Sequence, residues 1–503
     1  MKLLAGILTA FVLLGTGPKS EDLSKSKKSN LYVSHYENVL GTSLELKFTS
    51  TSEIEAEKAE QAALAEINRL SIIFSAYNAK SEFSKWMKQD LNKPVKVSKE
   101  LYEMLDLFAQ WKTRTNGALD ASATVAGQVW KQAAIKQQLP TKMELNAAVA
   151  TMQQVHYTLN KENLTATRLD YTPLVMNTFA KSYIINLACD AALASSAINA
   201  AVVNIGGDLV IKGNLEEAVH VTNPLANAEN DAPIVKLLVN NKAIATSGNY
   251  RRGEQIGKNW YSHIIDPRTG KPVDGIISAT VIAPNATDAG ALATAFNVLN
   301  IAESKALAET VEGAAYLIIT KSGEQIESSN WSKYVNEENP VVEVANNLLQ
   351  DKGWDTKHEL AITFEFNRIE GNTHRPYAAI WVENEKRVPV RNLALWYKKT
   401  NWIPDLRNWY RINGDSFKAN KDNFASSTGA TRNPGKYTIK WDGKDDKGNY
   451  VPQGKYTIII ETAKEHGTDE IIRQPMEFKR ASKKIKHAGN VEISNLNFDY
   501  YKK

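Results

Sequence analysis

Cysteine is almost absent from this chain, and its scarcity excludes several kinds of site. The 503 residues include a single cysteine, Cys189, so an internal disulfide is impossible and no zinc or iron–sulfur spacing exists. Cys189 lies in the apolar run at residues 184–193. A buried structural thiol is the expected role there.

The sequence also lacks a large excess of charge. There are 61 basic and 56 acidic side chains, for a net charge of +5. That excess is too small for this length to indicate a nucleic-acid partner or an acidic substrate. We interpret the basic cluster near the C-terminus as a solvated edge: Lys479, Arg480, Lys483, Lys484 and Lys486.

Long apolar runs are missing after the first residues. Lys2 precedes an apolar stretch at residues 3–14, which Gly15, Thr16 and Gly17 follow. This pattern predicts a signal peptide at residues 1–17, and the polar residues 18–30 a linker. We expect a periplasmic protein, or one attached to the inner membrane and facing the periplasm if the segment stays uncleaved.

The rest of the chain divides into two predicted domains. Helices and strands alternate over residues 31–340, which predicts an α+β domain. Its strands are expected at residues 43–48, 201–205, 279–283 and 314–320, and its helices at 52–74, 179–194 and 288–299. Ser52 and Glu55 have the spacing of a capping box at the first of these helices.

Residues 355–503 read as short strands separated by turns rich in Gly, Asp and Pro. Strands are expected at residues 437–441, 456–461 and 491–496, which predicts an all-β, immunoglobulin-like sandwich. Core packing is the favoured role of Trp396, Trp402 and Trp409, with a binding platform as the alternative.

Glycine-rich and polar junctions punctuate the first domain at strand ends and helix starts. In chain order they include Leu40-Gly41-Thr42, Gly117-Ala118-Leu119-Asp120, Asn204-Ile205-Gly206-Gly207-Asp208, Thr246-Ser247-Gly248 and His263-Ile264-Ile265-Asp266-Pro267-Arg268-Thr269-Gly270. Each is weak alone, because Gly-Gly-Asp is usually a turn and a lone histidine is usually structural. Together, in this order, they resemble the ApbE family of FAD:protein FMN transferases over residues 32–320.

The resemblance implies transfer of FMN from FAD to a threonine hydroxyl of a target protein, with release of AMP. Some members instead hydrolyse FAD to FMN and AMP. In both reactions the pyrophosphate of FAD is attacked and a divalent cation is used. Mg²⁺ suits this role, because it accepts hard oxygen ligands and phosphate oxygens. A lysine supplies a point charge for phosphate, and a histidine can accept the hydroxyl proton.

The resemblance also assigns roles to individual residues. Catalytic roles fall on His263 and Lys181, and metal binding on Thr178, Asp288 and Thr294. The cofactor-binding positions are Leu40, Tyr77, Ala118, Leu119, Asp120, Lys181, Gly206, Gly207, Asp208, Ser247, Gly248, His263 and Ile265.

Four positions depart from the family pattern. Gly290 stands where a metal-binding Asp is usual, Val175 replaces an acidic residue, Ser182 replaces a glycine after the lysine, and Asn249 often corresponds to Asp. Asp288 lies six residues before Thr294, so in an ideal helix it points roughly 120° away and about 9 Å along the axis. It could bind metal only if the helix began later, and a helix N-cap is its favoured role.

These departures leave three functions open. The first is an FMN transferase. The second is a flavin-binding relative that lacks transferase activity or hydrolyses FAD instead. The third is a structural envelope protein. Losing two carboxylates would weaken Mg²⁺ binding.

The second domain resembles a small domain of unknown function that follows ApbE in some bacterial proteins, through its tryptophan-rich residues 395–410. The expected partner is an exported target with a Ser/Thr-Gly-Ala-Thr site. The segment Thr428-Gly429-Ala430-Thr431 is similar to such a site, with Thr431 as a self-target. A turn before the next strand is the favoured alternative, because Asn433-Pro434-Gly435 follows.

Overall fold

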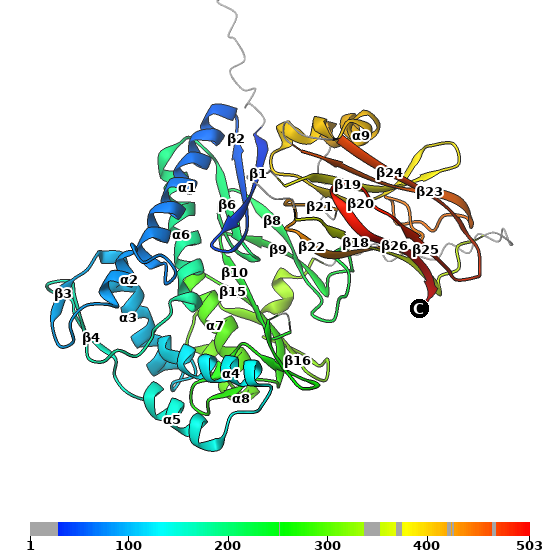
Figure 1. Cartoon of the computed structure of the whole chain (residues 1–503). Coiled ribbons are helices and arrows are strands. Elements are labelled where there is room, and N and C mark those ends of the chain that lie inside the picture. Colours follow the sequence, from blue (N-terminus) through cyan, green and yellow to red (C-terminus); the bar gives the residue numbers. More distant parts are fainter. Residues whose placement is uncertain are drawn as a thin grey trace, which may run out of the picture.

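The computed structural model describes residues 29–250, 252–336, 353–368, 375–419, 424, 427–464 and 469–503. The predicted signal peptide and nearly all of the predicted linker lie outside these residues. Figure 1 shows an α+β body, coloured blue to green, beside a smaller body of strands coloured yellow to red.

An antiparallel sheet of eight described strands forms the frame of the first body. Its order is β1-β2-β6-β7-β10-β15-β16-β17. The strands are β1 (Asn30–Val39), β2 (Thr42–Ser50), β6 (Ala200–Ile205), β7 (Asp208–Gly213), β10 (Ala243–Gly248), β15 (Ile276–Ala283), β16 (Ala315–Thr320) and β17 (Gln325–Glu327). The strands predicted at residues 43–48, 201–205 and 279–283 are confirmed, and the one at 314–320 begins one residue later.

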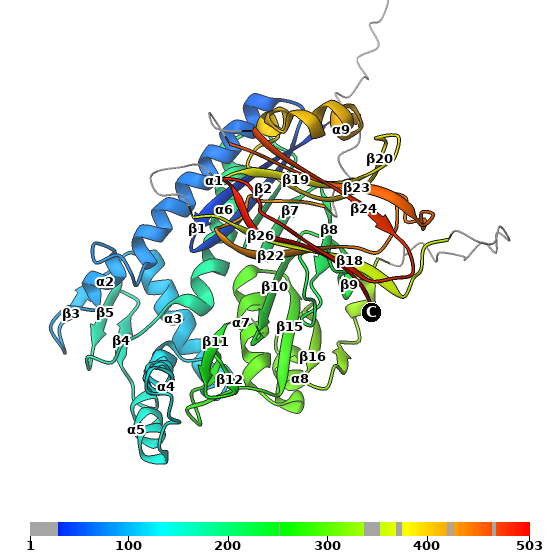
Figure 2. The same cartoon turned by 45° about the vertical axis from the view of Figure 1, so that its right-hand side comes forward.

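Three helices cover one face of this sheet: α1 (Glu53–Phe74), α6 (Asn177–Ser195) and α7 (Ala286–Val298). Helices α1 and α6 lie side by side in both views (Figures 1 and 2). One face of α1 is apolar and packs on the sheet, because Ile67, Leu70 and Phe74 are buried in the main core. Helix α7 is rich in Ala and apolar on nearly every side, as a helix enclosed by its neighbours must be.

The starts of two helices differ from the prediction. Ser52 precedes α1, but its side chain makes no capping bond, and Glu55 instead accepts the amide of Ala197 at 2.9 Å. The predicted capping box is therefore wrong. Helix α7 begins at Ala286, and its N-cap is Asn285, whose side chain accepts the amide of Asp288 at 2.9 Å. The N-cap role predicted for Asp288 is therefore also wrong.

The remaining elements of the first body surround this frame. One group comprises α2 (Glu82–Trp86), α3 (Lys99–Arg114) and a small sheet of β3 (Pro94–Lys96), β5 (Thr165–Arg168) and β4 (Tyr157–Asn160). A second group packs α4 (Thr124–Lys136) and α5 (Lys142–Met152) with the hairpin of β11 (Gly253–Ile256) and β12 (Asn259–Ser262). The others are η1 (Ala121–Ala123), β8 (Glu216–Val221), β9 (Val235–Asn240), β13 (Ile265–Asp266), β14 (Lys271–Pro272), α8 (Ile301–Glu309) and η2 (Trp331–Tyr334).

The second body is a sandwich of two sheets that share one core. One sheet has the order β22-β18-β26-β25 and the other β21-β20-β19-β23-β24. The strands are β18 (His358–Phe366), β19 (Tyr377–Asn384), β20 (Pro389–Trp396), β21 (Thr428–Gly429), β22 (Gly435–Trp441), β23 (Gly454–Ala463), β24 (Asp469–Phe478), β25 (Lys483–His487) and β26 (Ile493–Lys502). The strand predicted at residues 491–496 begins two residues later, within β26.

Tryptophans fill this sandwich, as core packing predicts. Trp396 is buried between the sheets. Trp409 belongs to α9 (Arg407–Ala419) and is buried where this helix, together with η3 (Thr400–Asp405), covers the outer face of the five-stranded sheet. Trp402 is partly buried in the same cluster. The favoured role of these three side chains is confirmed.

The two bodies touch along β1. The amide of His35 donates to the carbonyl of Lys398 at 2.7 Å, and Lys399 forms an ion pair with Glu60 of α1 at 2.7 Å. Arg375 forms an ion pair with Glu37. Backbone pairing and charge pairing together fix the sandwich against the edge of the large sheet.

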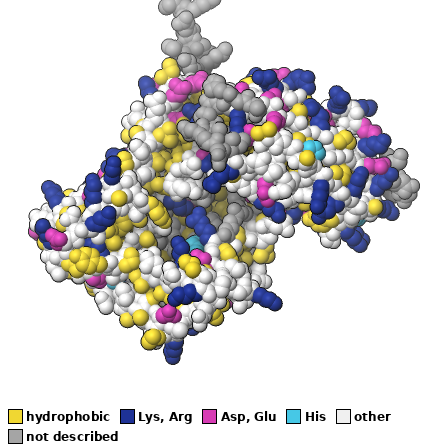
Figure 3. Space-filling model, in the orientation of Figure 1, with side chains coloured by type: hydrophobic (Ala, Val, Ile, Leu, Met, Phe, Trp, Pro, Cys, Tyr) yellow, Lys and Arg dark blue, Asp and Glu magenta, His cyan; other side chains and the backbone are white. Residues whose placement is uncertain are grey.

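The surface carries mixed charge. On the face drawn in Figure 3, basic side chains are interspersed with acidic ones rather than gathered in a single patch. The basic cluster near the C-terminus lies on and beside β25, the exposed edge strand of its sheet. Within the described residues, no helix is long and apolar enough to cross a membrane.

Candidate active site

Two glycines form the turn between β6 and β7, and the backbone requires both. Gly206 has φ +62° and Gly207 has φ +95°, conformations that other residues rarely adopt. A Cβ atom on Gly206 would lie 2.7 Å from Cγ2 of Thr42. The bare turn therefore lets the hairpin turn with Leu40 approach closely, and the amide of Gly206 donates to the carbonyl of Ser43 at 3.0 Å.

Lys181 reaches this glycine turn from the first turns of α6. Its Nζ lies 2.5 Å from Oδ2 of Asp208, the residue that follows the turn. The other carboxylate oxygen of Asp208 accepts the amide of Thr246 at 3.3 Å. The amide group of Asn297 on α7 donates to the carbonyl of Ser247 at 3.1 Å. The structure thus gathers the predicted residues of α6, the glycine turn and the end of β10.

His263 is exposed and has a defined hydrogen bond. Its Nδ1 lies 3.0 Å from the carbonyl oxygen of Arg252. A carbonyl can only accept, so Nδ1 carries the hydrogen and Nε2 keeps its lone pair in the neutral ring. Partial removal of the ring from water lowers the pKa of His263, and the Arg252 charge lowers it further, although the bond to the carbonyl opposes both. The neutral, proton-accepting form is therefore favoured at neutral pH.

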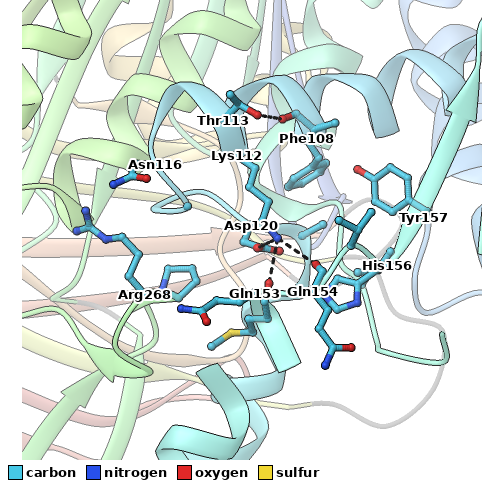
Figure 4. Close-up of a pocket in the computed structure, with 17 residues that line it drawn as sticks. Phe108, Lys112, Thr113, Asn116, Asp120, Gln153, Gln154, His156, Tyr157 and Arg268 are labelled. Carbon is cyan, nitrogen blue, oxygen red and sulfur yellow. Dashed lines mark hydrogen bonds and ion pairs between the residues drawn. The ribbon is translucent and has the colours of Figure 1, made fainter. Parts of the chain in front are cut away.

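Asp120 of the tripeptide Ala118-Leu119-Asp120 lines a cavity of about 590 Å³ (Figure 4). Ala118 and Leu119 are buried and are not among its described lining residues. The carboxylate of Asp120 lies 2.6 Å from Nζ of Lys112 and also accepts the amide of Ser122 at 2.7 Å. The described lining does not include Lys181 or His263. The segment that leads into α6 lies against the wall of this cavity, because the amide of Val175 donates to the carbonyl of Ala121 at 2.9 Å.

Comparison with known proteins now decides the family. A model of the ApbE family matches residues 40–318. The chain belongs to the ApbE family. A second family model, described as a predicted periplasmic protein (DUF2271), matches residues 359–495 of this ApbE-family chain. Both resemblances drawn from the sequence are confirmed.

Relatives agree with this assignment. The FAD:protein FMN transferase of Haemophilus influenzae is 27% identical over 351 residues, covering 67% of this chain and 99% of that protein. The one from Vibrio cholerae is 30% identical over 292 residues, covering 56% and 85%. The ApbE protein of Thermotoga maritima superposes with a TM-score of 0.55 at 25% identity, over 61% of this chain and 100% of that one.

A flavin transferase ApbE from Vibrio cholerae has a TM-score of 0.51 at 23% identity, over 61% of this chain and 99% of that one. This likeness supports the fold of the ApbE-family body.

Two predicted cofactor residues of this ApbE-family chain, Tyr77 and Ile265, are not among the contacts described above for Lys181. Tyr77 is 89% exposed in the loop after α1. Ile265 is buried in β13 and packs with α4 and α5. Tyr77 has the solvent access that a stacking residue needs, whereas Ile265 supports the loop that carries His263.

Two of the three predicted metal residues, Thr178 and Thr294, lie on α6 and α7, the helices that pack together at Gly290. Thr178 lies in the first turn of α6, and Thr294 is half-buried on α7. Because α7 starts at Ala286, Asp288 and Thr294 share one helix, so the condition for Asp288 to bind the same ion is not met. Asp288 instead accepts the side-chain amide of Asn285 at 2.7 Å and lies 4.0 Å from Arg114.

Across the described chain there is no group of three or more His, Cys, Asp or Glu that could hold a metal ion. The residues at the crossing therefore do not fit a cation held by a protein carboxylate.

Sequence reasoning missed three contributors to this region. Lys112 pairs with Asp120, Thr42 packs on the glycine turn, and Asn297 ties α7 to β10. Thr42 stands in the Leu40-Gly41-Thr42 junction noted in the sequence, but none of the three contacts carries a local signal, because each partner lies far away in the sequence or on another element.

Proposed function

We propose that this protein transfers FMN from FAD to a hydroxyl of another exported protein. The hydroxyl oxygen attacks the phosphorus of the FMN half of FAD. A new P–O bond forms, the bond to the bridging oxygen breaks, and AMP leaves with that electron pair. The hydroxyl proton passes to Nε2 of His263.

The geometry of His263 carries this proposal. Its bond to the Arg252 carbonyl fixes the tautomer with Nε2 as the acceptor, and the residue is open to solvent, where a protein target can reach it. A base with these properties is what a threonine hydroxyl requires as it attacks. No step in this scheme is assigned to a protein-bound metal.

Lys181 supports the phosphate contact. Its ammonium group is held 2.5 Å from the carboxylate of Asp208, the residue that follows the glycine turn. The pair orients the lysine without the substrate, and an incoming phosphate can share the same positive charge.

We propose that the acceptor is a separate protein with a Ser/Thr-Gly-Ala-Thr site, met in the periplasm. Thr431 of this chain is only 5% exposed, and its hydroxyl donates to Oε1 of Glu37 at 3.2 Å where the two bodies meet. Self-transfer to Thr431 would require the sandwich to leave β1. Mass spectrometry after incubation with FAD and Mg²⁺ tests this alternative, through an FMN-sized adduct on the Thr431 peptide.

The main experiment measures AMP release and FMN attachment to a peptide carrying the acceptor site. His263→Ala should abolish attachment, whereas His220→Ala, which removes an exposed histidine from β8, should not. Equal attachment by wild type and His263→Ala would refute the proposed base. Free FMN without peptide adduct would instead indicate FAD hydrolysis.

A flavin-binding protein without transfer is the second candidate, because the α6–α7 crossing offers no carboxylate for a metal. It predicts bound FAD or FMN with no AMP release. Retention of flavin by gel filtration, combined with the AMP assay, separates the two.

A further inference from the structure

Gly290 and Ser182 face each other across the crossing of α7 and α6. A Cβ atom built on Gly290 would lie 2.3 Å from Oγ of Ser182 and 3.3 Å from its Cβ. Real Cβ atoms do not approach a neighbour at 2.3 Å, so the serine hydroxyl fills the space that a side chain at position 290 would need. Ser182 is 1% exposed, so its hydroxyl has no open solvent to turn into.

The oxygens at this crossing are neutral. The carbonyl oxygen of Thr178 lies 3.7 Å from the same Cβ position, one helical turn before Ser182 on α6. Thr294 follows Gly290 by one turn on α7, and residues four apart share a helix face. Carbonyl and hydroxyl oxygens are ligands that Mg²⁺ accepts, but Mg²⁺ sites normally include a carboxylate or substrate phosphates.

The two nearby carboxylates are already engaged. Asp208 pairs with Lys181 and accepts the Thr246 amide. Asp288 is bonded to Asn285 at the start of α7. Neither supplies a free negative charge to the crossing.

We infer that Ser182 and Gly290 form a size-matched pair, in which the serine hydroxyl stands where a side chain of residue 290 would lie. A divalent cation at this crossing would therefore meet only neutral protein oxygens, and would bind only together with the pyrophosphate of the substrate. The second part, about the cation, rests on the proposed function, which identifies the pyrophosphate as that of FAD. The first part concerns packing alone.

The packing test compares thermal unfolding of Gly290→Ala in two backgrounds. We expect a clear fall in the midpoint with Ser182 present, and recovery with Ser182→Gly, because the clash then disappears. If Gly290→Ala lowers the midpoint equally with and without Ser182→Gly, the pairing is refuted. This readout needs neither FAD nor activity.

The metal test uses Mn²⁺ in equilibrium dialysis with the full chain. Without FAD, wild type should retain little Mn²⁺, whereas Ser182→Gly/Gly290→Asp should bind it more tightly by on the order of tenfold or more, since a carboxylate has been added. Ser182→Gly/Gly290→Ala is the matched control, with the same packing and no carboxylate, and should behave as wild type. Adding FAD should make wild type retain Mn²⁺ beyond what FAD alone holds.

Three results would overturn the inference. They are tight Mn²⁺ binding by wild type without FAD, no gain in the variant with Asp at position 290, or no protein-bound Mn²⁺ when FAD is present. Failure of the proposed function would appear separately, as absence of AMP release by wild type under conditions where Mn²⁺ and FAD are retained.

Discussion

The glycine turn between β6 and β7 allows a quantitative prediction with an internal control. Gly206 and Gly207 are neighbours and both have positive φ, but a Cβ on Gly207 would meet nothing within 4 Å. On Gly206 it would meet Thr42 at 2.7 Å. Alanine at each position therefore separates backbone strain from the contact with Thr42.

Backbone strain should cost about 1–2 kcal/mol of folding free energy in either variant. Gly206→Ala adds overpacking against Thr42, which costs roughly 1–3 kcal/mol in well-packed regions. Alanine also restricts the unfolded chain more than glycine does, which offsets the cost in both variants by about 0.4–1 kcal/mol. The expected difference between them is therefore the contact term, about 1–3 kcal/mol.

Thermal unfolding measures this difference. At about 2–4 °C per kcal/mol for domains of 150–250 residues, Gly206→Ala should melt roughly 2–12 °C below Gly207→Ala. Thr42→Ala removes the two closest atoms and should restore most of the difference in the Gly206→Ala background. Equal midpoints for the two glycine variants, or no rescue by Thr42→Ala, would refute the reasoning.

Three further predictions concern the candidate site and the contact between the two bodies along β1. The rate of FMN transfer should fall only as the pH drops below about 6.5, the ordinary pKa of histidine, because the pKa of His263 is lowered and its neutral ring is the base. The pH–rate profile of His220→Ala should show the same fall at acidic pH. Lys181→Met should weaken FAD binding about tenfold in a fluorescence titration. Lys212→Met, which breaks an ion pair of equal length between β7 and Asp190 of α6, should leave FAD binding unchanged. Burial lowers the pKa of His35 below its unfolded value, so stability should be full above pH 6.5 and decline below it, and His35→Leu should flatten this dependence in thermal melts from pH 7.5 to 5.

The position of His35 gives the last prediction a local cause. Its ring packs edge-on against Tyr397 of the sandwich, and Nε2 has no partner in the described structure. Glu45 lies 3.6 Å from Nδ1 and favours the charged ring, but Lys47, Arg432 and above all burial oppose it. If the melting temperature of wild type does not fall at acidic pH relative to His35→Leu, the neutral buried form is disproved.

The sequence alone determined the features that depend on local chemistry. Alternating and helical periodicity located β2, β6, α1 and α6, because burial of one face repeats along the chain. Glycines at strand ends marked the turn at Gly206 and Gly207, since only glycine adopts positive φ readily. The ordered set of such junctions was sufficient to predict the family.

Tertiary structure decided which groups meet. Asn285 rather than Asp288 caps α7, because both residues are good caps and only the path of β15 into the helix selects between them. Thr431 is buried by the docking of the sandwich on β1, a contact between residues almost four hundred positions apart. No periodicity encodes such a contact.

The same distinction applies to Ser182 and Gly290. The sequence revealed that a carboxylate is absent at Gly290 and that a serine follows Lys181, as two separate departures. Only the crossing of α6 and α7 shows that they occupy one space, because steric exclusion depends on which helices pack together. The order of motifs thus predicted the family, while packing decided that the hydroxyl of Ser182 occupies the space beside Gly290.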